Sequence, residues 1–418
     1  MSMADGRALQ VVRAATIGVA LGAIASPPVA NLAAAIMLAA FFFVPDWRER
    51  LRGFLRSRLG KGVLVFAAAL LVATVVAAFN AQGFVGGLKE LLRWRTLVLL
   101  AIAFAVFDSA RWKTRFAVVF IGFTSLAAIV SLLSWFFDWH YGDLPSGIIL
   151  RNTVTQAMAF AIGAFLAGML LVMRPALTVR ERLLLVGAAM VLLGQLVFLQ
   201  VGRSGQVMFA ILAIVAAALL MRGPRRVLAI LSVPVLAAIA FSVSPIMQSR
   251  FATAWQELQH AADATEYTSM GIRVVMWQNT VELIRARPVL GYGLGGMEPA
   301  YAAHIKDRAS GWKAIVTTDP HNQFLAAWVE GGLAGLLAFL FLLVSAARQP
   351  APPAWRPIAL SFLVAWCATS MISSHFQTFN EGNLIAILLG VFLAPAGADE
   401  PAPQTEERAA ATAAVTSS

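Results

Sequence analysis

Charged side chains and cysteines are both scarce in this chain of 418 residues. Only 13% of the residues are charged, about half the share of a soluble domain, and a single cysteine excludes an intrachain disulfide. The motifs GxxxxGK[ST], HExxH, CxxC and Gly-x-Ser-x-Gly are missing as well. We therefore expect neither a soluble enzyme nor a P-loop ATPase, and no metal or other cofactor.

Apolar residues, by contrast, make up 60% of the sequence, enough for about twelve membrane helices of roughly 20 residues each. The pattern predicts an all-α polytopic membrane protein with about 12 transmembrane helices. The expected spans are 8–25, 29–44, 62–79, 95–107, 116–137, 157–173, 183–201, 207–221, 227–244, 321–346, 358–376 and 384–395. The stretch 84–95 is amphipathic and is expected on the membrane surface.

Basic residues indicate the orientation. The net charge is +11, and 20 of the 32 Lys and Arg fall on one side of the predicted topology, against five in the short loops of the other side. Cytoplasmic loops accumulate Lys and Arg, so both termini are expected in the cytoplasm. This asymmetry also explains the positive charge without a nucleic-acid partner.

The predicted organisation has four parts. Residues 1–244 form transmembrane helices 1–9, residues 245–320 a long periplasmic loop with amphipathic helices, residues 321–395 helices 10–12, and residues 396–418 a disordered cytoplasmic tail. Within the loop, helices are expected over 250–262 and 272–287. Long ordered loops tend to carry function, so this loop is the first place to look for a site.

Three polar residues from distant segments are predicted at the outer membrane face. Arg203 lies in a short external turn, Arg273 on a loop helix and His321 at the start of the tenth span. Arginine offers a planar fork for phosphate oxygens, and histidine accepts a proton near neutral pH. Each residue also has a plain alternative, since arginines extend into lipid headgroups and a histidine can cap a helix.

Further polar residues fall near the same face. Trp277, Arg151, Asn322 and His375 are possible lining residues of one cavity. Glu330 is the one carboxylate placed well inside a predicted span, where an acid serves transport or bonds within the helix bundle; its glycine-rich surroundings favour the structural role.

Three motifs together resemble the O-antigen ligase and polymerase superfamily. They are His321-Asn322-x-x-Leu325 with Glu330-x-Gly332-x-x-Gly335, Gly271-x-Arg273-x-x-x-Trp277 with Pro288-x-x-Gly291-x-Gly293, and Arg203 before the eighth span. The resemblance implies a type C glycosyltransferase-like fold in the bacterial inner membrane, with the active site facing the periplasm. It implies transfer of O-antigen glycan from undecaprenyl diphosphate to a sugar hydroxyl of lipid A-core, without metal or ATP.

Site roles follow from the same resemblance. His321 would be the general base of an inverting transfer, and Arg203 and Arg273 would bind the diphosphate. The length and the single late loop are most similar to the ligases, while O-antigen polymerases and O-linked protein oligosaccharyltransferases of the superfamily stay open. A lipid-linked glycan flippase, a transporter rather than an enzyme, would share the predicted topology.

Overall fold

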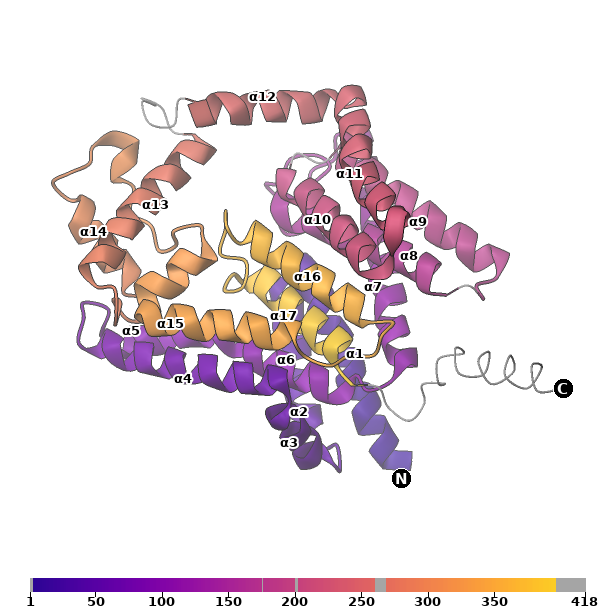
Figure 1. Cartoon of the computed structure of the whole chain (residues 1–418), viewed down its shortest axis with the longest axis horizontal. Helices are drawn as coiled ribbons and strands as arrows, with labels where there is room; N and C mark the ends of the chain where they lie inside the picture. The colour runs from indigo at the N-terminus through magenta and orange to yellow at the C-terminus, as the bar shows by residue number, and fades with distance from the viewer. Residues whose placement is uncertain (1–2, 175, 200–201, 260–267, 396–418) are drawn as a thin grey trace.

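The protein is all-helical in the part of the chain that the structure describes. The computed structural model describes residues 3–174, 176–199, 202–259 and 268–395, and within them it has α-helices, two 3-10 helices and no strand (Figure 1). The elements are α1 (Met3–Ala25), α2 (Pro27–Phe41), α3 (Trp47–Arg56), α4 (Arg58–Ala78), α5 (Gly83–Leu91), η1 (Leu92–Arg95), α6 (Thr96–Val106), α7 (Ala110–Phe136), α8 (Thr153–Met173), α9 (Val179–Phe198), α10 (Arg203–Leu220), α11 (Gly223–Val243), α12 (Pro245–Gln259), α13 (Ser269–Ala286), α14 (Met297–Ile305), η2 (Gly311–Ala314), α15 (Gln323–Ala347), α16 (Arg356–Thr369) and α17 (Phe379–Leu393). The tail expected over 396–418 lies outside the described residues.

Seven helices among the described residues are long and apolar enough to cross a membrane, namely α1, α4, α7, α8, α9, α11 and α15. Helices α2, α10, α16 and α17 are apolar but shorter. The chain is therefore a multi-pass membrane protein. Every expected span overlaps a helix, but α6 has only 11 residues, well below the roughly 20 that cross a bilayer. The count of twelve stays a prediction.

Several expected boundaries were wrong. Arg203 is the first residue of α10, not part of a turn, and α16 ends at Thr369 instead of residue 376. Helix α16 stops early because the polar stretch after it bonds elsewhere: Gln323 N donates to Ser370 O at 2.9 Å and Phe376 N donates to Gln323 Oε1 at 3.1 Å. The amphipathic stretch 84–95 forms α5 and η1, whereas α3 and α14 were not anticipated.

Helix α17 lies at the centre of the helix bundle. All its residues from Asn380 to Leu393 are buried, and it packs against α6, α1 and α16. A helix that is apolar on all sides belongs in the interior of a large assembly of helices. By contrast, α11 buries none of its residues and packs mainly against α10, and α12 extends from it toward α13 (Figure 1).

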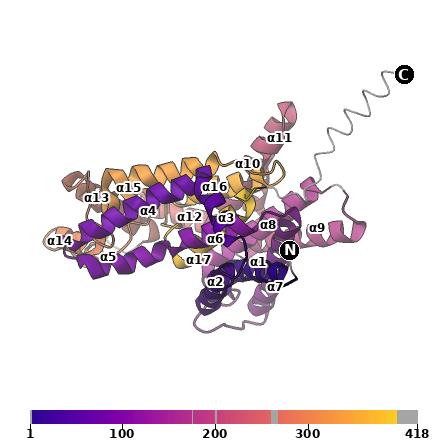
Figure 2. The same cartoon turned by 90° about the horizontal axis from the view of Figure 1, so that it is seen from below.

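Helix α15 lies along α4 in both views and contains a break (Figures 1 and 2). The break is at Gly332, whose φ of 62° and ψ of −166° interrupt the helical hydrogen bonds. The segment 288–293 supplies replacements, because Tyr292 N donates to Val329 O and Gly293 N to Glu330 O, both at 2.9 Å, and Leu333 N donates to the Pro288 carbonyl at 2.9 Å. Backbone groups freed inside a membrane protein need such partners.

Glycine is required on both sides of this junction. A Cβ on Gly332 would lie 2.0 Å from the Val289 oxygen, and a Cβ on Gly291 would lie 2.6 Å from Gly332 N. The glycine-rich segment 288–293 thus packs closely against α15 at its break.

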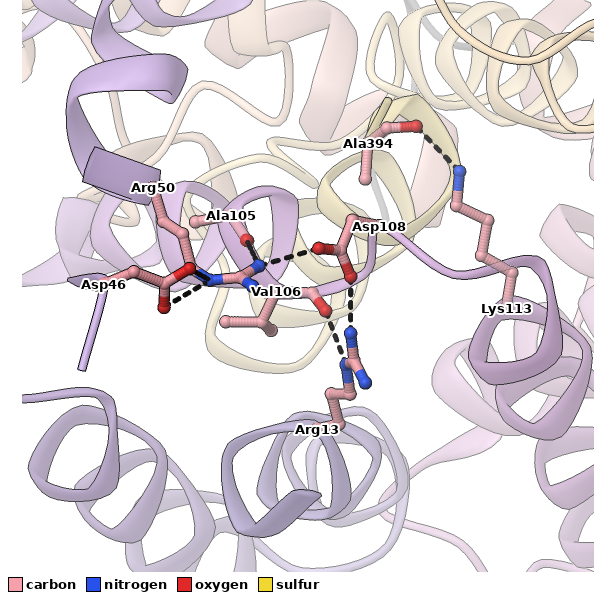
Figure 3. Close-up of polar contacts among 8 residues, drawn as sticks. All are labelled: Arg13, Asp46, Arg50, Ala105, Val106, Asp108, Lys113 and Ala394. Carbon is pink, nitrogen blue, oxygen red and sulfur yellow. Dashed lines mark hydrogen bonds and ion pairs between the residues drawn. The ribbon is translucent and has the colours of Figure 1, made fainter. Parts of the chain in front are cut away.

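Basic residues contact the C-terminal ends of α6 and α17 (Figure 3). Asp108 accepts from Arg13 and, at 2.7 Å, from Arg50. The two arginines also donate to the last carbonyls of α6, Arg13 Nε to Val106 O at 2.6 Å and Arg50 Nη1 to Ala105 O at 3.1 Å. Such contacts satisfy carbonyls that a helix C-terminus leaves free. The buried Lys113 does the same at the end of α17, where its Nζ donates to Ala394 O at 2.7 Å.

Candidate functional site

The segment before α15 forms a tight polar turn that fixes His321. Asp319 N donates to Thr317 Oγ1 at 3.1 Å, and the Asp319 carboxylate accepts from His321 N at 2.9 Å and from Ser374 Oγ at 2.6 Å. His321 has a φ of 52°, a left-handed conformation that costs a non-glycine residue about 1–2 kcal/mol. Backbone strain of this kind is concentrated at functional sites, where the surroundings hold it in place.

Asn322, and not His321, caps helix α15. Its Oδ1 accepts from Phe324 N at 3.0 Å and from Leu325 N at 3.1 Å, and its Nδ2 donates to Met371 O at 3.0 Å. This removes the plain alternative for His321, because the cap position is already filled. The amide of Asn322 thus has structural partners through both its oxygen and its nitrogen.

The surroundings of His321 favour a neutral imidazole. Burial lowers the pKa of its side chain below the ordinary value of 6.5, the charge of Asp319 raises it, and the charge of Arg273 lowers it. Asp319 and Arg273 therefore lie close enough to His321 to act on it electrostatically. A neutral imidazole at neutral pH is able to accept a proton.

Arg273 and Trp277 lie one helical turn apart on α13. Arg273 Nη1 donates to the carbonyl oxygen and to Oγ of Ser269, both at 2.6 Å, which directs the guanidinium along the helix. Trp277 Nε1 is buried without a hydrogen-bond partner among the residues that the structure describes. The predicted spacing of these two side chains on one helix is confirmed by α13.

His375 joins the same group from the connection between α16 and α17. It is 3% exposed and lies after the end of α16, although the predicted span reached residue 376. Its Nδ1 is buried with no hydrogen-bond partner in the described part of the chain. Burial lowers the pKa of His375; the charges of Glu381 and Asp319 raise it, and those of Arg273 and His321 lower it. We call Arg273, Asp319, His321, His375 and Glu381 the polar cluster.

Sequence reasoning missed two members, Asp319 before α15 and Glu381 on α17. Glu381 was placed in an external loop, but it lies in the first turn of α17 with 7% of its surface exposed. Its carboxylate accepts from Thr155 Oγ1 at 2.7 Å and from Thr378 Oγ1 at 2.8 Å. The signal was present, because Thr378-x-x-Glu381 has the spacing of a helix start and would have moved the beginning of this helix forward.

The structure does not bring Arg151 into the polar cluster. Arg151 is exposed, and its one recorded contact is from its backbone N–H to Ile24 O at 3.3 Å. Arg203 opens α10, but its side chain lies outside what the structure describes. The start of α10 packs tightly on α8, because a Cβ on Gly205 would lie 2.5 Å from the Ala157 carbonyl oxygen.

Glu330 lies in α15 beside the helix break and not in the polar cluster. Its Oε1 accepts from Gly295 N at 3.1 Å, and its carbonyl oxygen accepts from Gly293 N. Both contacts attach the glycine-rich segment to α15. They support the structural role that the neighbouring glycines indicated.

The comparison with known families covers the part of the chain that contains Arg273, His321 and Glu330. Residues 188–340 match the model of a family described as O-antigen ligase. The resemblance is confirmed over this segment. A stretch of 78 residues is also 30% identical to an uncharacterised protein of Haemophilus influenzae, which is 19% of this chain and 20% of that protein. The match thus spans about a fifth of that curated relative, and its name assigns no activity.

Proposed function

We propose that the protein is an O-antigen ligase that transfers a glycan from undecaprenyl diphosphate to a sugar hydroxyl of lipid A-core. The observation that carries this proposal is the position of Arg273 and Asp319 beside His321 within the segment that matches the ligase family. A cation for the diphosphate and a neutral base for the hydroxyl are the two groups that such a transfer requires.

The reaction proceeds by direct displacement at the anomeric carbon. The acceptor hydroxyl oxygen forms the new bond to this carbon while the bond to the phosphate oxygen breaks, and His321 takes the hydroxyl proton. Arg273, together with Arg203, stabilises the charge that develops on the departing diphosphate. The anomeric configuration inverts. The activated donor makes ATP unnecessary, and the arginines take the place of a metal ion at the departing diphosphate.

The topology we propose places this chemistry at the periplasmic face of the bacterial inner membrane. Helices α6 and α17 both begin near the polar cluster and end at the contacts of Arg13, Arg50 and Lys113. Along α17, the polar cluster and these basic contacts are about 22 Å apart. Because the basic end belongs in the cytoplasm, the cluster faces the periplasm. The proposal includes twelve spans, a type C glycosyltransferase-like fold, both termini inside, and residues 245–320 as the periplasmic loop.

A flippase is the second candidate, and the break in α15 is the observation that favours it, because transporters use discontinuous helices. Here, however, backbone hydrogen bonds from the segment 288–293 fill the break. Helix α11 contains Pro234 and continues through that proline. The hydrogen bonds across the break in α15 and the continuity of α11 favour a rigid enzyme over a transporter whose helices move.

The test uses purified protein, a polyprenyl-diphosphate glycan, and three acceptors: lipid A-core, free glycan and an acceptor protein. The proposal predicts product with lipid A-core, without ATP, gradient or added metal. Product with glycan alone would identify a polymerase, and product with protein alone an oligosaccharyltransferase. Movement of the donor across a liposome membrane with no product would identify a flippase.

The arginine assignment has its own test in the variant Arg273→Lys. Lysine keeps the charge but cannot make a two-pronged contact with phosphate oxygens, so we expect weaker donor binding and slower transfer. Arg308→Lys, at an exposed arginine paired with Glu282, is the matched control and should leave transfer unchanged. Full activity of Arg273→Lys would remove the support for diphosphate binding.

A further inference from the structure

A pocket adjoins the turn before α15, and Asp319 is among its lining residues. It has a volume of about 340 Å³ and is lined by residues that include Arg93, Arg95, Asp319, Gln377, Phe379 and Asn383. Asp319 connects it to the polar cluster, because its carboxylate accepts from His321 N at 2.9 Å. Arg273 is not part of the lining.

Asn383 is a lining residue of this pocket, and its side chain has an unsatisfied acceptor. The side chain is 3% exposed and its Nδ2 donates to Phe379 O at 2.7 Å, whereas its Oδ1 is buried and has no hydrogen-bond partner among the described residues. Leaving a buried acceptor unpaired costs about 1–3 kcal/mol. A ligand hydroxyl that donates to Oδ1 would recover this cost.

Arg95 provides positive charge at the same pocket. Its Nη2 donates to Asn31 Oδ1 at 2.9 Å and its guanidinium lies 5.2 Å from the ring centre of Phe379, so neutral groups hold it in place. The ion pairs of the described residues include Arg93 with Glu90 at 2.8 Å but none with Arg95. Guanidinium has five N–H donors, which leaves several for an anionic group of a ligand.

We propose that this pocket binds the acceptor as an anionic saccharide, with Arg95 on its carboxylate or phosphate and Asn383 Oδ1 accepting from a sugar hydroxyl. The proposal rests on the proposed function. In a direct displacement, the attacking hydroxyl and the leaving diphosphate lie on opposite sides of the anomeric carbon. Arg273 serves the diphosphate and is not among the residues that line this pocket, whereas Asp319 joins the pocket to His321, so the pocket serves the attacking sugar.

The test is equilibrium binding of fluorescently labelled lipid A-core to the purified full-length protein, without donor. We expect Arg95→Gln to weaken binding by roughly ten- to a hundred-fold and Asn383→Ala by roughly ten-fold. In transfer, both variants should raise the acceptor KM and leave the donor KM unchanged. Arg308→Gln, at an exposed arginine outside the pocket, is the control. If Arg95→Gln fails to fold after losing its contact with Asn31, Asn383→Ala decides by the same measurement.

Two treatments of the acceptor identify the anionic group. Phosphatase treatment should abolish the difference between wild type and Arg95→Gln if the group is a phosphate, and carboxyl reduction should abolish it if the group is a carboxylate. The proposal would be overturned if both variants bound the acceptor as tightly as wild type. It would also be overturned if the variants bound the donor more weakly but the acceptor normally. If wild type binds lipid A-core but forms no product, the proposed function fails while the acceptor site stands.

Discussion

His321 and Asn322 are adjacent in sequence but have different proposed roles. Alanine substitution of His321 should impair catalysis, and alanine substitution of Asn322 should impair stability. Asn322→Ala removes the acceptor of two backbone N–H groups at the start of α15 and the donor to Met371 O. A lost cap costs about 1 kcal/mol and the lost hydrogen bond to the Met371 carbonyl about another 0.5–1.5 kcal/mol, so we expect a destabilisation of about 2 kcal/mol. The recorded hydrogen bond of His321 uses its backbone N–H, which alanine retains.

His321→Ala should therefore melt near the wild-type temperature but transfer glycan about 10²–10⁴-fold more slowly, the usual contribution of a general base. Single-turnover transfer and thermal unfolding in detergent, measured on both variants, form the assay. Asn322→Ala should show the opposite pattern, with a lower melting temperature and a nearly normal rate in the folded fraction. Wild-type turnover in His321→Ala would refute the base assignment, and unchanged stability in Asn322→Ala would refute the role of the cap.

Two other predictions concern pH and the helix break. Transfer requires neutral His321 and should rise with pH to half its maximum below pH 6.5, since burial lowers the pKa of this histidine. Arg273→Gln removes a charge that lowers that pKa and should move the half-maximum up, whereas Asp319→Asn removes one that raises it and should move it down; shifts of the pH profile in the same direction would contradict the assignment. Gly332→Ala should prevent stable folding, because its Cβ would lie 2.0 Å from a carbonyl oxygen at a φ of 62°. Gly331→Ala, where a Cβ meets nothing within 4 Å, should express and melt like wild type, and equal expression of the two variants would show that the break is dispensable.

Helix positions were largely predictable because membrane helices must be apolar over their length. The runs at 116–137 and 157–173 correspond to α7 and α8 within a few residues. The boundary of α16 was not predictable in this way, because residues 370–376 are as uncharged as a span but form hydrogen bonds with the segment before α15. Hydropathy measures the cost of leaving water and contains no information about such partners.

Arg273 and His321 could be chosen as candidate site residues from the sequence, since the proposed chemistry of a diphosphate and a hydroxyl calls for these residue types and a family motif supplied their positions. The residues that surround them could not be predicted from the sequence. Glu381 and Asn383 look like ordinary loop residues until α17 buries them, and Asp319 gains its importance from Ser374 and the backbone of His321.

The sequence by itself determined the class of protein, because scarce charge and abundant apolar residues leave the membrane as the only solvent that suits this chain. It also indicated the orientation, through the basic residues that collect at one end. Only the tertiary structure decided which polar groups meet. Contacts between residues 80 to 230 positions apart, such as Asn80 with Tyr292 or Thr155 with Glu381, arise from helix packing, and no local pattern encodes them. The break in α15 has the same origin, because Gly332 can leave the helix only where the segment 288–293 satisfies the backbone groups that the break exposes.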